Sequence, residues 1–187
     1  MKLLKPLLLA AGVLSASLAQ ASILVSEPGA DGFNIETMVL NGSSFDITSL
    51  TFDFTNTVTG DNSFIVIDGS PISITPPAGG TATFFGSGAV FGFNFTSFNS
   101  FDTFKFKWDP DSNVSGSYGA TGLDFVGAKI TAQTTNGLYS GVMAKVNGSP
   151  DVAAVLTPVP EPETYALVIG GLATVGAIAR RRAAKKA

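Results

Sequence analysis

The sequence predicts an all-β protein, an antiparallel, jelly-roll-like β-sandwich with a targeting segment at each end. Two observations predict the sandwich. Apolar residues in the middle of the chain recur with a period of two, as in half-buried strands. Turn-forming Gly, Pro, Asn and Asp return about every eight to twelve residues, as in small sandwiches. No convincing helical pattern occurs over residues 22–156, a length sufficient for one buried core.

The first strands show the alternation most simply. "SILVS" starts the series, and "FNIETMVL" puts alternate residues on one face: Phe33, Ile35, Thr37 and Val39. In "FDITSLTFDF" the apolar phase changes near Ser49, which predicts a bulge or a strand that passes between sheets. Asn41-Gly42, between these two runs, is a candidate two-residue hairpin turn.

Phenylalanine dominates the next strands. "SFIVI" and "TATFF" lie on either side of a Pro- and Gly-rich connection, and "AVFGFNF" alternates Phe with small or polar residues. "FDTFKFKW" places Phe104, Phe106 and Trp108 inward, with Lys105 and Lys107 outward, as in a half-buried antiparallel strand. These runs predict a core built mainly from phenylalanine.

The last strands contain a predicted hairpin. Asn136-Gly137 suits a type I′ turn, because both central residues of that turn need positive φ. Ile130 and Ala132 precede the turn. Apolar residues with a period of two follow it: Leu138, Val142, Ala144 and Val146. With "VAAVL" near the end of the domain, the strands number about nine or ten.

Composition removes several classes of chemistry. The chain of 187 residues has no cysteine and no histidine, so it has no thiolate nucleophile, disulfide or imidazole base. Residues 22–159 carry four lysines and twelve carboxylates, a net charge of −8, so we expect no nucleic-acid partner. We therefore expect a protein that is not an enzyme. A secreted hydrolase that uses carboxylates such as Asp53, Asp102 or Asp124 is the third alternative.

Residues 1–21 have the pattern of a secretory signal peptide. Two lysines precede a short apolar stretch, and Ala19 and Ala21 occupy the −3 and −1 positions of a cleavage site. The passenger domain is therefore expected to span residues 22–156.

Residues 157–187 contain three parts in order. A linker with Pro-Glu-Pro covers 157–163, an uncharged apolar segment covers 164–179, and a basic tail covers 180–187. As a helix, the part from Tyr165 to Ala179 is roughly 23 Å long, which is short for a hydrocarbon core of about 30 Å. We expect a transmembrane helix with thinning or snorkelling at its edges. Because cations favour the cytoplasmic side, the acidic domain is expected outside.

These three parts closely resemble the PEP-CTERM sorting signal of Gram-negative bacteria. The resemblance covers residues 159–186 and implies processing by an exosortase, a membrane-embedded transpeptidase-like enzyme. It makes Pro160, Glu161 and Pro162 the recognition residues. The stop-transfer cluster that it implies consists of three arginines: Arg180, Arg181 and Arg182. The resemblance carries no activity, because such tails are attached to many different passengers.

The resemblance also implies a place for the protein. Proteins of this class are associated with exopolysaccharide, biofilm and the cell surface. We expect export through the inner membrane, a transient anchor there, and then residence at the cell surface or in the extracellular matrix. A structural or adhesive role is expected, with an exosortase as partner and exopolysaccharide as a candidate ligand. The alternative is a carbohydrate-binding module, with calcium as a candidate helper.

Two candidate ligand sites come from individual side chains. "DPDSN" offers oxygen ligands at Asp109, Asp111 and Asn113, but the Gly and Glu of an EF-hand are missing from their positions. A surface turn is the simpler explanation, so we expect no cofactor, with calcium as the candidate exception. Trp108 is the candidate for stacking on a sugar, and burial in the core is its ordinary alternative.

Overall fold

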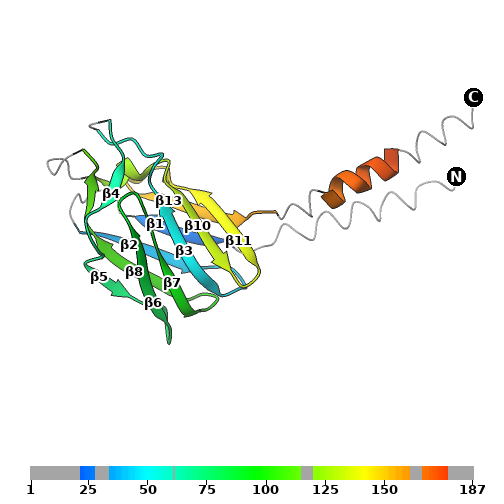
Figure 1. Cartoon of the computed structure of the whole chain (residues 1–187), viewed down its shortest axis with the longest axis horizontal. Coiled ribbons are helices and arrows are strands. Elements are labelled where there is room, and N and C mark those ends of the chain that lie inside the picture. Colours follow the sequence, from blue (N-terminus) through cyan, green and yellow to red (C-terminus); the bar gives the residue numbers. More distant parts are fainter. Residues whose placement is uncertain (1–21, 28–33, 61, 115–119, 161–165, 177–187) are drawn as a thin grey trace, which may run out of the picture.

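The computed structural model describes residues 22–27, 34–60, 62–114, 120–160 and 166–176 (Figure 1). These residues contain thirteen strands, a single turn of 3₁₀ helix at Gly122–Phe125 and a helix over 166–176. The strand pairings are antiparallel, and two layers of strands pack face to face. The predicted all-β sandwich is therefore confirmed.

The first layer has the strand order β5-β8-β2-β1-β13, with β12 also paired to β13. Its strands have the following bounds: β1 Ile23–Glu27, β2 Ile35–Asn41, β5 Ser73–Thr75, β8 Thr103–Trp108, β12 Ala144–Lys145 and β13 Val152–Pro158. Alternate residues of β1 and β2 are buried, because the Ile and Val of these strands share one face of the pleat. The other face is partly open to solvent.

The second layer has the order β11-β10-β3-β7-β6. Its strands have the following bounds: β3 Ile47–Asp53, β6 Thr81–Ser87, β7 Val90–Phe98, β10 Lys129–Thr134 and β11 Gly137–Val142. Pairing of β11 with β13 joins the two layers into one folded sheet, whose path of paired strands ends at β5 and β6. A separate pair at the rim consists of β4 (Ile65–Ile67) and β9 (Pro110–Ser112).

Aromatic rings fill the space between the layers. The ring of Phe106 in β8 lies 4.7 Å from that of Phe93 in β7 and 5.4 Å from that of Phe52 in β3, measured between centroids. Trp108 and Phe91 are 5.1 Å apart in the same way. Full burial of each such side chain contributes roughly 1.5–3 kcal/mol. The predicted phenylalanine core is therefore the main contact between the two layers.

The phase change in β3 is a bulge. The register of β3 against β7 shifts between Ile47 and Ser49, and the register of β10 against β3 shifts between Gln133 and Thr134. Since β3 keeps the same two neighbours along its length, it does not cross between layers. The bulge lets Ile47 and Leu50 both point inward although they are three positions apart in the sequence.

The prediction of a hairpin turn at Asn41-Gly42 is wrong. β2 pairs with β1 and β8, whereas β3 pairs with β7 and β10, so this segment connects the two layers. The Asn41 amide is buried and donates to the carbonyl oxygens of Phe45, Phe98 and Asn99 at 2.9, 3.1 and 3.0 Å. A Cβ at Gly42 would lie 2.5 Å from a backbone carbonyl oxygen, which explains the glycine. The Asn41 side chain thus donates hydrogen bonds to backbone carbonyl oxygens at a corner between strands, where buried carbonyls need such partners.

The hairpin of β10 and β11 is confirmed, but its predicted turn type is wrong. Thr134 pairs with Gly137, which leaves Thr135 and Asn136 as the two central residues. Gly137 has a φ of 116°, and Asn136 is not among the described non-glycine residues with positive φ. A type I′ turn needs positive φ at both central residues, so the glycine here follows the turn instead of lying within it.

The apolar residues after this turn face outward. Leu138 is 39% exposed and Val142 is 57% exposed. Tyr139 is the inward residue of β11, because it pairs with Ala132 on the buried face of β10. The outer face of the second layer is therefore more apolar at β11 than a strict inside-outside pattern implies.

The helix over 166–176 follows the last strand. Each of its residues is exposed, and Figure 1 shows it apart from the sandwich. The expected helix over 164–179 extends beyond the described residues at both of its ends. Among the described residues, no helix is both long enough and apolar enough to cross a membrane.

Candidate functional site

The structure describes one residue of the predicted sorting motif. Pro160 is exposed and lies two residues beyond the end of β13. The last backbone hydrogen bond before it runs from Val159 N to Leu138 O, at 2.7 Å. Glu161 and Pro162 lie outside the described residues.

The other predicted targeting residues also lie outside the described part of the chain. These are the two small residues of the signal cleavage site and the three arginines of the basic tail: Ala19, Ala21, Arg180, Arg181 and Arg182. Their proposed roles therefore rest on the sequence.

The structure contradicts the candidate role of Trp108 in sugar stacking and confirms its ordinary alternative, burial in the core. Its side chain is 0% exposed and lies among Phe54, Phe91 and Phe125, with centroid distances of 5.3, 5.1 and 5.3 Å. A ring that stacks on a sugar needs one open face, and both faces of this indole are covered. Trp108 is a core residue, as expected for the inward phase of β8.

The "DPDSN" segment forms a strand and the turn after it. Asp111 lies in β9 opposite Val66, and Asn113 N donates to Phe64 O at 3.0 Å. Burial first, and then the charges of Asp109 and Asp68, raise the pKa of the Asp111 carboxyl. Within the described ranges, no group of three or more acidic side chains is arranged to hold a metal ion.

The three carboxylates considered for hydrolysis each stabilise a local turn. Asp53 accepts from the amide and hydroxyl of Thr55, and Asp102 accepts from the backbone amide of Asn99. Asp124 accepts from the backbone amide of Thr121 at 2.8 Å and caps the 3₁₀ turn. These acids lie in different parts of the fold, and one oxygen of each accepts structural hydrogen bonds.

Glu27 is an unusual carboxylic acid among the described residues. It ends β1 in the same inward phase as Ile23 and Val25, and it is 2% exposed. Thr37 of β2 donates its hydroxyl proton to Glu27 Oε1, and Trp108 Nε1 donates to Thr37 Oγ1 at 2.9 Å. Glu27 Oε2 is buried without a hydrogen-bond partner in the described part of the chain. A polar chain of three side chains thus enters the aromatic core.

Burial determines the protonation state of Glu27. Desolvation raises its pKa from 4.5 to about 8, and the hydrogen bond from Thr37 opposes this shift only in part. At pH 7 the acid is therefore mostly protonated and neutral. A neutral acid avoids the large cost of an unpaired charge in an apolar interior.

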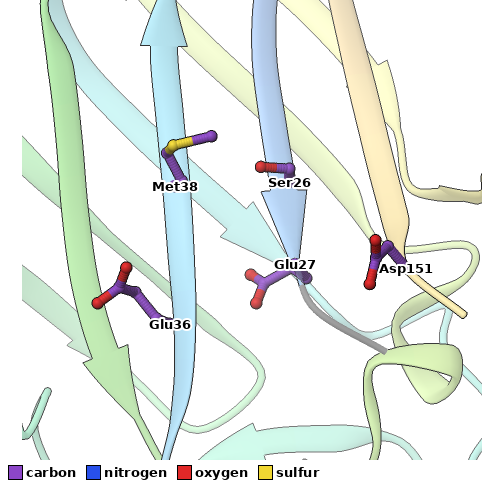
Figure 2. Close-up of a pocket in the computed structure, with 5 residues that line it drawn as sticks. All are labelled: Ser26, Glu27, Glu36, Met38 and Asp151. Atoms are coloured by element: carbon purple, nitrogen blue, oxygen red, sulfur yellow. The ribbon is translucent and has the colours of Figure 1, made fainter. Parts of the chain in front are cut away.

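Glu27 also borders a small pocket of about 300 Å³. Figure 2 shows Glu27 at the end of β1, with Glu36 of β2 on one side and Asp151 on the other. Ser26 and Met38 complete the lining. Glu36 is paired with Lys105 at 3.0 Å, and Asp151 accepts from Ser149 Oγ at 2.6 Å. The pocket thus combines a neutral acid with two carboxylates that already have partners, which suits a structural role better than acid-base chemistry.

Comparison with protein-family models, with curated proteins and with solved structures found no match to this chain.

Sequence reasoning did not single out Glu27, although a signal was present. In "ILVSE" the acid occupies the position of a buried apolar residue two places after Val25. Thr37 occupies the same kind of position between Ile35 and Val39. Two polar residues in the inward phase of neighbouring strands are the pattern that indicates a buried hydrogen-bonded pair.

Proposed function

We propose that the chain is an exported, non-enzymatic protein of the cell envelope or extracellular matrix, sorted by a PEP-CTERM-type tail. The signal peptide over 1–21 directs export, and the β-sandwich is the passenger that is delivered. An exosortase then acts near Pro160, Glu161 and Pro162. The role of the passenger is structural or adhesive, with exopolysaccharide as the candidate ligand.

The observation that carries this proposal is the order of three parts after the domain: Pro-Glu-Pro, an apolar segment and a basic cluster. The fold is compatible with cleavage at this place. The strand ladder ends with β13 at Pro158, and Pro160 is exposed just beyond it. A peptidase must hold its substrate in an extended form, and a segment outside the ladder is available for that.

The apolar segment over 164–179 is proposed as a transient anchor in the inner membrane. Support comes from the exposed apolar side chains of its described helical part, such as Leu167, which is 77% exposed, and Leu172, which is 69% exposed. These side chains find no cover on the described sandwich. Burial in lipid would remove them from water at roughly 25 cal/mol per Å².

A non-enzymatic role is supported by composition and by the hydrogen bonds of the acids. The chain lacks histidine and cysteine. The carboxylates of Asp53, Asp102 and Asp124 cap turns, and the buried acid Glu27 is tied to the core through Thr37. Each of these groups has a role in the fold that does not need a substrate.

The experiment that tests the proposal is a motif substitution in the native host. The double variant Pro160→Ala and Glu161→Gln keeps the size of the segment but removes the fixed φ and the charge of the motif. We expect this variant to stay in the membrane fraction with its tail attached, while the wild type leaves that fraction. Pro150→Ala is the matched control, because Pro150 is also exposed and precedes β13. Release of the double variant at the wild-type level would contradict the proposal.

A further inference from the structure

The two ends of the folded sheet are unequal. β5, at one end, has three residues and follows Pro71, and Pro76 comes directly after it. β6, at the other end, has seven residues, and it pairs on one side only, with β7 (Figure 1). Along its free side, alternate backbone N–H and C=O groups lack a strand partner. Natural proteins usually protect such an edge with charges, proline or a very short strand, and β6 has none of these.

The hydrophobic core is also incomplete at this edge. Three partly buried apolar residues pack against the core cluster in the described structure, and all three lie in the hairpin of β6 and β7: Ala82, Phe84 and Ala89. The Phe84 ring contacts Phe91 and Phe93 at centroid distances of 6.0 and 5.6 Å. Phe84 is thus an inward ring with part of its surface still open to solvent. A further strand beside β6 would cover that surface.

The uncharged edge at β6 allows a second copy of this acidic chain to approach. The segment over 69–101, which contains β5, β6 and β7, has no charged residue. Residues 22–159 as a whole have a net charge of −8, so two copies repel each other over most of their surfaces. The edge at β6 lies in this uncharged segment, so two copies can approach there without that repulsion.

We propose that two copies of the chain associate by antiparallel pairing of β6 with β6 of the second copy, around a two-fold axis at Phe84. In this register Phe84 lies opposite Phe84, Thr83 opposite Phe85, and Thr81 opposite Ser87. Paired residues then point to the same side, so Ala82 and Phe84 of both copies face the core side. The same sequence is complementary to itself, which is what a two-fold interface requires.

The pairing makes one continuous sheet from the second layers of both copies. The free N–H and C=O groups of each β6 would bond to the other copy, and the open side of each Phe84 ring would be covered. Such β-strand addition takes its affinity from the backbone and its specificity from the matching faces. A single strand pair buries a small area, so we expect a reversible dimer that depends on concentration.

The first test measures association of the full chain in mild detergent by sedimentation velocity over a dilution series. The double variant Thr83→Lys and Ser87→Lys places like charges at diagonal positions across the proposed pair, and both positions are exposed. We expect it to raise the dimer dissociation constant by roughly tenfold or more. The matched control, Asn94→Lys and Gln133→Lys, adds the same charge at exposed positions on interior strands of the same layer. It should associate like the wild type, and circular dichroism checks that both variants stay folded.

The second test locates the contact. Because the chain has no cysteine, a single Thr83→Cys residue can be cross-linked without background. In the proposed register the two side chains at position 83 are diagonal neighbours about 7–8 Å apart, within reach of a short bismaleimide. Gln133→Cys is the control, since β10 of one copy would lie seven strand spacings, about 34 Å, from β10 of the other.

The expected result is a cross-linked dimer of Thr83→Cys that does not form with Gln133→Cys. Three results would overturn the proposal. The chain could remain a monomer at every concentration, or the variant with Thr83→Lys and Ser87→Lys could associate like the wild type. Equal cross-linking of the two cysteine variants would show that the copies meet elsewhere.

Discussion

At the scale of single residues, the main feature is the chain of Glu27, Thr37 and Trp108 inside an aromatic core. Trp108 Nε1 donates a hydrogen bond to Thr37 Oγ1, and the Thr37 hydroxyl donates one to Glu27 Oε1. The second oxygen of Glu27 has no partner within the described ranges. Glu27 is therefore accommodated in the core as a neutral acid, and its ionisation lowers the free energy of unfolding.

This cost predicts a pH dependence that Glu27→Gln should remove. The folded state holds the proton more tightly than the unfolded chain, because the pKa rises from 4.5 to about 8. The stability that protonated Glu27 contributes is thus fully present below pH 4.5 and is lost as the pH rises toward 8. The loss is on the order of 5 kcal/mol. Urea unfolding of wild type and variant at pH 4.5, 6 and 8 measures it.

We expect the two proteins to have similar stability at pH 4.5, because the glutamine is a neutral side chain of the same shape. At pH 8 the variant should be more stable than the wild type. The same difference between the two proteins at all three pH values would show that Glu27 titrates normally in the folded state.

Thr37→Val tests the middle of the chain. Valine has the shape of threonine but no hydroxyl, so it leaves both Trp108 Nε1 and Glu27 Oε1 without their partner. We expect a loss of about 2–4 kcal/mol in the free energy of unfolding. Thr131→Val, on the outer side of β10, is the control and should change stability by less than about 0.5 kcal/mol. Equal effects of the two substitutions would mean that the hydrogen bonds at Thr37 contribute nothing.

At the scale of elements, the corner after β2 holds the two layers in register. Asn41 donates to three carbonyl oxygens, and its own Oδ1 accepts from the amide and hydroxyl of Ser43. Two of these carbonyls, those of Phe98 and Asn99, lie where β7 ends. One side chain thus joins the connection from β2 to β3 with the connection from β7 to β8.

Asn41→Ala should therefore destabilise the sandwich strongly. It leaves several buried backbone groups without partners, and we expect a loss of about 3 kcal/mol or more in the free energy of unfolding. Asn94→Ala is the matched control, because Asn94 is exposed on β7. Chemical denaturation of both variants gives the comparison, and an effect of Asn41→Ala below about 1 kcal/mol would contradict this account of the corner.

The sequence predicted elements well where the alternation extended over several residues. The strands around Val39, Phe93 and Phe106 and the inward direction of these side chains follow from period two alone. The two- and three-residue strands β5, β9 and β12 are too short to carry a periodic pattern. The turn at Asn136 and the corner at Asn41 also could not be predicted. Asn-Gly occurs in both, and only the pairing of distant strands decides which conformation forms.

At the scale of the whole molecule, the proposed targeting residues can be found from the sequence alone, whereas the roles of residues in the sandwich depend on which strands lie side by side. The Pro-Glu-Pro motif and the basic tail could be found from sequence because their signal is local and ordered. Glu27 was missed because its importance depends on β2 and β8 lying beside β1. Trp108 was a candidate because the sequence does not show whether its ring is open to solvent. In the structure, Phe54 and Phe125 pack against the ring and leave no face open for a sugar.

The chain as a whole thus combines an acidic sandwich, an uncharged edge and two terminal segments that we propose to be address segments. The central claim is that the address segments are removed during export. The most direct measurement is the intact mass of the protein recovered from the outside of its native cell. The account predicts a mass that lacks residues 1–21 and the helix after Pro162. A surface protein that still carries the basic terminus at 180–187 would contradict it.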